Sequence, residues 1–111
     1  MGRRRHIRRI GVAAVIATLA LGVVVAEAGG ASVDGSNYSF KPRTVRIQKG
    51  GKVKWHWVNG RHTVTFVKGS YDKILSRNHP TRSRTFKRRG TFRYYCRFHR
   101  SLDMKGKVVV G

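Results

Sequence analysis

The chain has 111 residues, of which 25 are lysine or arginine and only 4 are aspartate or glutamate, so its net charge is +21 at pH 7. With 40% hydrophobic residues it is too apolar for a disordered basic tail, and its length suits one small domain. Its single cysteine excludes an internal disulfide. The few acids form no carboxylate pair for hydrolytic catalysis, so we expect a protein that is not an enzyme.

The first 28 residues have the pattern of a secretory signal peptide. Arginines at positions 3, 4, 5, 8 and 9 precede an apolar run of 17 residues, Ile10 to Ala26, and Ala26-Glu27-Ala28 fits a small-x-small cleavage site. Because the run is almost long enough to cross a bilayer, a retained membrane anchor is the alternative. Both interpretations place the following domain outside the cytoplasm, in the periplasm, secreted or tethered to the membrane.

After a linker predicted at residues 29–36, one domain is predicted to span residues 37–111 and to consist of short strands. Apolar and polar residues alternate in each run, and turns that contain glycine separate the runs. The section from Lys68 to Pro80 is irregular, with a helical turn at Asp72 to Leu75 as its candidate element. The predicted strands cover residues 37–40, 44–48, 53–58, 62–67, 81–86, 91–96 and 105–110. This pattern predicts an all-β fold, a Greek-key β-sandwich or barrel of about seven or eight strands.

The loop between the last two predicted strands carries three metal-ligating side chains. Cys96 is followed by His99 three positions later and by Met104 five positions after that. Two imidazoles, one thiolate and a weak axial thioether make up a type 1 copper site, so this loop lacks only a second histidine. The alternatives are that Cys96 is an inert buried thiol and that Met104 only fills the core.

The second histidine has to come from another strand. His62 begins a predicted strand directly after a turn. His56 lies between Trp55 and Trp57, whose rings are expected in the core, so its imidazole should face solvent. His79 precedes a proline in the irregular section. The sequence therefore predicts a copper site formed by His62, Cys96, His99 and Met104.

With these ligands, the chain resembles the plastocyanin/azurin family of copper-binding proteins, the cupredoxins. The Cys-x2-His-x4-Met loop has the spacing of plastocyanin. The other matching stretches extend over nearly all of the domain: Tyr38-Ser-Phe40-Lys-Pro42, Val45-Arg-Ile47, Val53-Lys-Trp55, His62-Thr-Val64, Thr85-Phe86 and Gly90 to Cys96. The resemblance implies a Greek-key sandwich with copper near one end, with Cys96, His62 and His99 equatorial and Met104 axial.

The resemblance also assigns roles to residues beside the ligands. His99 would reach the surface and serve as the port for electrons. Tyr95 would lie on a second electron route. The backbone amide of Thr63 would help to fix the cysteine sulfur, which is a supporting role common around metal ligands.

The chain departs from the family pattern through additional arginines. Arg88 or Arg89 stands where relatives commonly have proline, and Arg100 follows the loop histidine. We expect Arg97 and Arg100 to rim His99. A further basic run comprises Arg82, Arg84, Lys87, Arg88 and Arg89. This run is either a solvated face or, with Arg88 and Arg89 joining Arg97 and Arg100, a docking surface for an acidic partner.

The favoured function is an exported one-electron carrier that is monomeric and meets an acidic redox protein, such as a cytochrome or a copper oxidase. A copper-delivery protein without a redox partner has the same ligand set. A cationic anion-binding module on a β-barrel is the third candidate. The signal peptide argues against nucleic acid as the partner, whereas peripheral contact with an anionic membrane or cell wall remains open.

Overall fold

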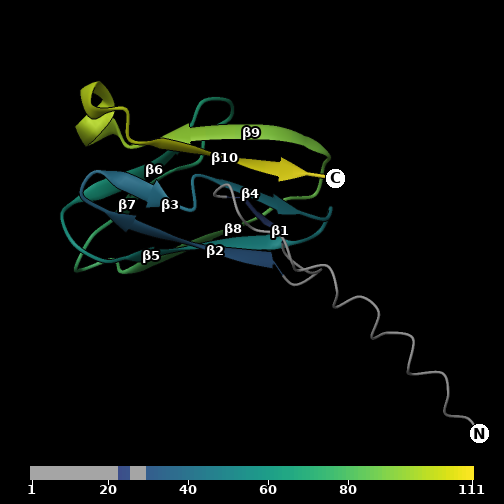
Figure 1. Cartoon of the computed structure of the whole chain (residues 1–111), viewed down its shortest axis with the longest axis horizontal. Helices are drawn as coiled ribbons and strands as arrows, with labels where there is room; N and C mark the ends of the chain where they lie inside the picture. The colour runs from purple at the N-terminus through teal and green to yellow at the C-terminus, as the bar shows by residue number, and fades with distance from the viewer. Residues whose placement is uncertain (1–22, 26–29) are drawn as a thin grey trace, which may run out of the picture.

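The computed structural model describes residues 23–25 and 30–111, which form two packed β-sheets (Figure 1). The strands are β1 (Val23–Val25), β2 (Gly30–Ser36), β3 (Ser39–Lys41), β4 (Thr44–Ile47), β5 (Lys52–Trp57), β6 (His62–Phe66), β7 (Asp72–Leu75), β8 (Thr81–Thr85), β9 (Gly90–Tyr95) and β10 (Lys105–Val110). The larger sheet has the order β1-β4-β10-β9-β6-β7 and the smaller has the order β3-β2-β5-β8. The all-β fold class is therefore confirmed, with ten strands among the described residues instead of seven or eight.

The core lies between the two sheets and follows the alternation of apolar residues. In β4 the side chains of Val45 and Ile47 are buried while their neighbours are not, and in β5 Val53 and Trp55 are buried. Trp57 was expected in the core but is only half-buried, because β5 ends there at the edge of the sandwich. This period of two is what a sheet with one covered face requires.

The segment predicted to be a linker, residues 29–36, is the one correction to the domain boundaries. Residues Gly30–Ser36 form β2, which pairs in parallel with β5 and antiparallel with β3. Val33 is the one large apolar side chain of this strand, so its sequence lacks alternation. Hydrogen bonds from strands on both sides hold it instead, and a Cβ at Gly35 would lie only 2.8 Å from the Leu75 side chain. The strand belongs to the domain.

The section from Lys68 to Pro80 is also more regular than predicted. Asp72–Leu75 is strand β7, not a helical turn, and it pairs with β6 from His62 opposite Leu75 to Thr65 opposite Asp72. In this short edge strand only Leu75 is fully buried. Its four residues therefore carry too little apolar signal for a prediction by pattern.

The predicted signal peptide lies outside the described residues apart from β1, which pairs in parallel with β4. Within the part of the chain that the structure describes, no helix is long and apolar enough to span a membrane.

Strands β9 and β10 place the metal-ligating loop. They pair antiparallel from Lys105 opposite Tyr95 to Val110 opposite Gly90, so the chain leaves and re-enters the sheet at the same end. Between them lies a short 3-10 helix, η3 (Arg97–Leu102), beyond the strand ends (Figure 1). Because β6 pairs with β9 next to this end, His62 lies beside the loop although it is distant in sequence.

Candidate metal centre

Three of the predicted ligands converge at the end of the sandwich where η3 lies. The Nδ1 atoms of His62 and His99 are 3.3 Å apart. The Sγ atom of Cys96 lies 3.4 Å from Nδ1 of His99 and 3.9 Å from Nδ1 of His62. The three side chains therefore present their ligand atoms to one common point.

The size of this triangle fits one metal ion. Bonds of about 2.0 Å to imidazole nitrogen and about 2.3 Å to thiolate sulfur are usual for a first-row ion such as zinc. In a trigonal array those bonds place the ligand atoms roughly 3.5–3.7 Å from one another. Two nitrogens and one sulfur at this spacing are the donors that define a type 1 copper site.

His62 is held in the tautomer that a metal needs. Its Nε2–H donates to the carbonyl oxygen of Asn59, 2.7 Å away, which leaves the lone pair of Nδ1 free for the metal. Burial lowers the pKa of the imidazole, with the nearby His99 adding to this effect, so the neutral form is favoured. A histidine ligand has to be neutral to bind.

The turn before His62 is itself fixed. Trp57 donates its Nε1–H to the carbonyl of Gly60 at 2.6 Å, and the amide of Asn37 donates to Oδ1 of Asn59 at 2.9 Å. Gly60 has φ +83, and a Cβ there would lie 2.8 Å from Nε2 of His62. A glycine is therefore required at this position, both for its backbone conformation and for the space of the histidine ring.

Cys96 and Met104 face each other at the ends of β9 and β10. The amide of Cys96 donates to the carbonyl oxygen of Met104 at 3.0 Å, and both side chains are buried. Asp103 takes φ +61 to turn the chain between η3 and Met104. The buried Met104 therefore lies near the ligand cluster.

Comparisons with known proteins agree with this donor set. The family model for copper-binding proteins of the plastocyanin/azurin family matches residues 28–111. The chain belongs to this family. As a cupredoxin it has copper as its cofactor, and His62, Cys96 and His99 form its type 1 ligand cluster, with Met104 nearby.

Solved structures of other cupredoxins share the fold. A reduced amicyanin variant has 29% identity and a TM-score of 0.64, covering 75% of this chain and 83% of its own. Oxidised plastocyanin from Dryopteris crassirhizoma has 25% identity and a TM-score of 0.61, covering 79% and 100% respectively. A pseudoazurin from Sinorhizobium meliloti, at 24% identity and a TM-score of 0.61, covers 78% of this chain and 75% of its own, and supports the fold alone.

In this cupredoxin, His99 is the ligand closest to solvent. His99 is half-buried, and the Tyr38 ring packs against it in an edge-to-face arrangement with 4.7 Å between the two ring centroids. Tyr38 is 50% exposed, and Phe98 and Leu102 of η3 are exposed as well. The surface around the copper end thus combines apolar rings with arginines, because the guanidinium groups of Arg61 and Arg97 lie 4.7 and 5.4 Å from the centroid of the Phe98 ring.

A directional chain of hydrogen bonds anchors the loop to β6 and β7. The amide of Arg97 donates to Oγ1 of Thr63 at 2.8 Å, and the hydroxyl of Thr65 donates to Asp72 at 2.7 Å. Since Thr65 has only one hydroxyl proton, Thr63 donates across the 2.9 Å that separate the two hydroxyls. Nε of Arg97 donates to the same oxygen of Asp72 at 3.0 Å and closes the ring.

This chain changes the role expected for Thr63. The resemblance suggested its backbone amide, whereas its hydroxyl is the group that accepts a hydrogen bond from the loop. The hydroxyl of Thr65 and the guanidinium of Arg97 lower the pKa of Asp72, so the carboxylate stays ionised as the terminal acceptor. Sequence reasoning missed Thr65, Asp72 and also Asn59. Only the alternation of threonines in β6, all of whose residues are buried, hinted at a polar network.

Replacing Thr63 with valine is expected to loosen the loop while leaving the three ligands in place. Valine has nearly the same shape but cannot accept the hydrogen bond of the Arg97 amide, and loss of such a part-buried hydrogen bond costs about 1 kcal/mol. The free energy of unfolding, measured by denaturant titration of the copper-loaded protein, should fall by that amount. Thr81→Val on the exposed part of β8 is the matched control and should change little. Equal losses in both variants would contradict this role.

The arginines expected at the docking surface lie in three different settings. Arg97 is paired with Asp72, and the guanidinium of Arg100 stacks 4.4 Å from the centroid of the Tyr95 ring. Arg88 and Arg89 precede β9, whose six residues separate them from Cys96 by about 20 Å. They therefore do not lie beside His99, and Arg93 of β9 is the basic residue between them and Arg100.

Proposed function

We propose that this cupredoxin is an exported one-electron carrier. The observation that supports it best is the triangle of His62, Cys96 and His99, which hydrogen bonds and packing hold in place. Bound copper would supply the Cu(II)/Cu(I) couple. A ligand set that is fixed by the fold changes little between the two oxidation states, and small rearrangement is what rapid electron transfer needs.

The surroundings of the ligands provide two ways for an electron to leave. The half-buried imidazole of His99 brings one ligand close to a partner docked at the apolar surface of Tyr38 and Phe98. Tyr95 precedes Cys96 in the chain, and its side chain lies at the outer face of β9 and β10. It therefore offers a covalent route for the electron from the Cys96 thiolate to that face. Two observations support export: the signal-peptide pattern of residues 1–28, and membership of the cupredoxins, which typically act outside the cytoplasm.

Self-exchange and copper retention together test the carrier against a delivery protein. In a mixture of Cu(I) and Cu(II) protein, NMR line broadening should reveal rapid electron exchange between molecules. The exchange should become faster with added salt, because salt screens the repulsion of two strongly basic proteins. A competing chelator should remove copper slowly. Slow exchange combined with ready loss of copper to the chelator would contradict the proposal and favour delivery.

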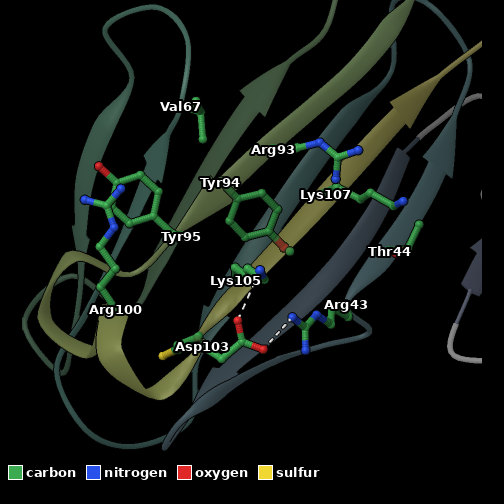
Figure 2. A pocket seen from close by; sticks show the side chains of 12 residues that line it. Arg43, Thr44, Val67, Arg93, Tyr94, Tyr95, Arg100, Asp103, Lys105 and Lys107 are labelled. Atoms are coloured by element: carbon green, nitrogen blue, oxygen red, sulfur yellow. Dashed lines mark hydrogen bonds and ion pairs between the residues drawn. The ribbon is translucent and has the colours of Figure 1, made fainter.

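The partner that fits this carrier is an acidic redox protein. Five basic residues line a hollow of about 520 Å³ on the outer face of β9 and β10, the β9–β10 groove: Arg43, Arg93, Arg100, Lys105 and Lys107. Asp103 is the one acidic residue that lines the groove, and Figure 2 shows it bridging Arg43 and Lys105. The groove therefore keeps an excess of positive charge beside Tyr95, where an acidic surface would be attracted.

Small oxidants of opposite charge provide a test that needs no natural partner. An anionic iron cyanide complex should oxidise the Cu(I) protein faster at low salt than at high salt, because the basic surface attracts it. A cationic cobalt complex should show the reverse dependence. Lys105→Gln/Lys107→Gln should slow the anionic reagent more than Lys52→Gln/Lys54→Gln, which removes the same charge from β5. Equal effects of the two double variants would assign the dependence to net charge alone.

A further inference from the structure

Arg84 is a partly buried cation that is surrounded by aromatic rings. Its guanidinium carbon lies 4.4 Å from the centroid of Phe66 and 4.8 Å from that of Phe86. The rings of Tyr71 and Phe92 lie slightly farther away, at 5.5 and 5.7 Å. Its Nη1 is buried and has no hydrogen-bond partner. Ring faces attract the charge, but they leave this N–H donor unsatisfied.

Arg82, the other inward-pointing arginine of β8, does have a hydrogen-bond partner. Arg82 and Arg84 both point inwards from β8, but Nε of Arg82 donates to the carbonyl of Ile74 at 2.7 Å. Among the ion pairs of the described residues, none involves Arg84. Burial lowers the pKa of its guanidinium, which reflects the cost of a charge without a counter-charge.

A basic hollow opens beside Arg84. It has a volume of about 510 Å³ and lies between the β6–β7 turn (residues 66–69) and the segment from Arg88 to Arg93. No acidic residue lines it, and its cations are Lys68, Arg84, Arg88, Arg89 and Arg93. We call this the distal hollow, because β9 separates its arginines at positions 88 and 89 from the copper ligands.

We propose that the distal hollow binds a phosphate-class oxyanion, with Arg84 as its anchor. Arginine forks match the oxygens of such anions, and several cations around one small concave site suit a multiply charged ligand better than a single carboxylate. The anion would supply acceptors and a counter-charge to a guanidinium that the protein leaves unpaired. Inorganic phosphate in solution and a phosphate group of a lipid or cell-wall polymer offer the same chemistry. The site is independent of copper.

Titration of the copper-loaded full chain with inorganic phosphate tests this proposal. At constant ionic strength, set with chloride, calorimetric titration should show saturable binding of phosphate. The midpoint of thermal unfolding should rise with the logarithm of the phosphate concentration, because phosphate binds the folded state. Arg84→Met should weaken the apparent affinity about tenfold or more, since it removes a charge-assisted donor. Arg88→Gln/Arg89→Gln should also weaken it, and this exposed pair provides the test if Arg84→Met does not fold. Lys52→Gln/Lys54→Gln, exposed on the outer face of β5, is the matched control and should keep the affinity within about twofold.

Vesicles distinguish the two sources of phosphate. Binding to phosphatidylglycerol vesicles that is lost in Arg88→Gln/Arg89→Gln but kept in Lys52→Gln/Lys54→Gln assigns the site to a headgroup. Saturable binding of inorganic phosphate without such vesicle binding assigns it to the free ion. Two results would overturn the proposal. One is the absence of saturable phosphate binding in the calorimetric titration. The other is equal losses in both double variants, which would reduce Arg84 to an inward-pointing charge that protects an edge strand.

Discussion

Replacement of Cys96 by serine is expected to abolish the intense visible absorption of the copper protein. The thiolate is the one soft donor in the triangle with His62 and His99, and the strong band of a type 1 site is a transfer of charge from this sulfur to copper. A serine hydroxyl stays protonated near neutral pH and cannot replace it. Adding Cu(II) to the purified variant and recording the visible spectrum measures the effect.

Met104→Leu is the control for this experiment. Leucine fills nearly the same buried volume but offers no sulfur, so the variant should remain coloured while its reduction potential rises. The rise is expected because loss of an axial donor disfavours the higher oxidation state more. Colour that survives in Cys96→Ser would remove the thiolate from the site. A colourless Cu(II) complex of the unmodified protein would do the same.

The ligands themselves were predictable because their signal is local. Cys96, His99 and Met104 are fixed by spacing within one loop, and His62 was separated from His56 and His79 by its position at the start of a strand. The structure brings His62, Cys96 and His99 together in one cluster. A short loop keeps its side chains close together, so the types and spacing of the ligands within it already indicate the kind of metal site.

The supporting residues were not predictable from the sequence, because each depends on pairing between distant segments. Asp72 reads as a polar residue in an irregular section until β7 pairs with β6 and places it beside Thr65. Asn59 reads as a turn residue until its carbonyl meets Nε2 of His62. Pattern identifies which side chains are apolar, but not which backbone edge lies next to which.

Strand β2 and the arginines are two further cases in which the sequence pattern did not reveal how distant segments are placed. Gly30–Ser36 has too few apolar residues to show alternation, yet β3 and β5 pair with it along both edges. Arg88, Arg89, Arg97 and Arg100 are close in sequence, which suggested one docking surface. The length of β9 divides them between opposite ends of the sandwich. Proximity in sequence becomes misleading as soon as an extended strand lies between two residues.

Replacement of Trp55 by alanine is expected to cause the largest loss of stability. Trp55 is fully buried, and its ring lies 5.3 Å from that of Tyr94 and 5.9 Å from that of Phe66. Deleting such a side chain from a core costs about 3–5 kcal/mol. Domains as a class have only about 5–15 kcal/mol of stability, and small ones lie towards the lower end. Without copper, the variant should therefore unfold at a much lower denaturant concentration.

Copper should restore a large part of what Trp55→Ala removes, because Trp55 lies in the core and is not one of the clustered ligands. A metal at a hundred times its dissociation constant adds about 2.7 kcal/mol to the folded state. Denaturant titrations with and without copper should show this difference in both the variant and the unmodified protein. Val109→Ala is the comparison, since loss of this half-buried side chain on β10 should cost about 1 kcal/mol. If copper failed to stabilise Trp55→Ala, the core and the metal site would be one cooperative unit in which the ring itself positions the ligands.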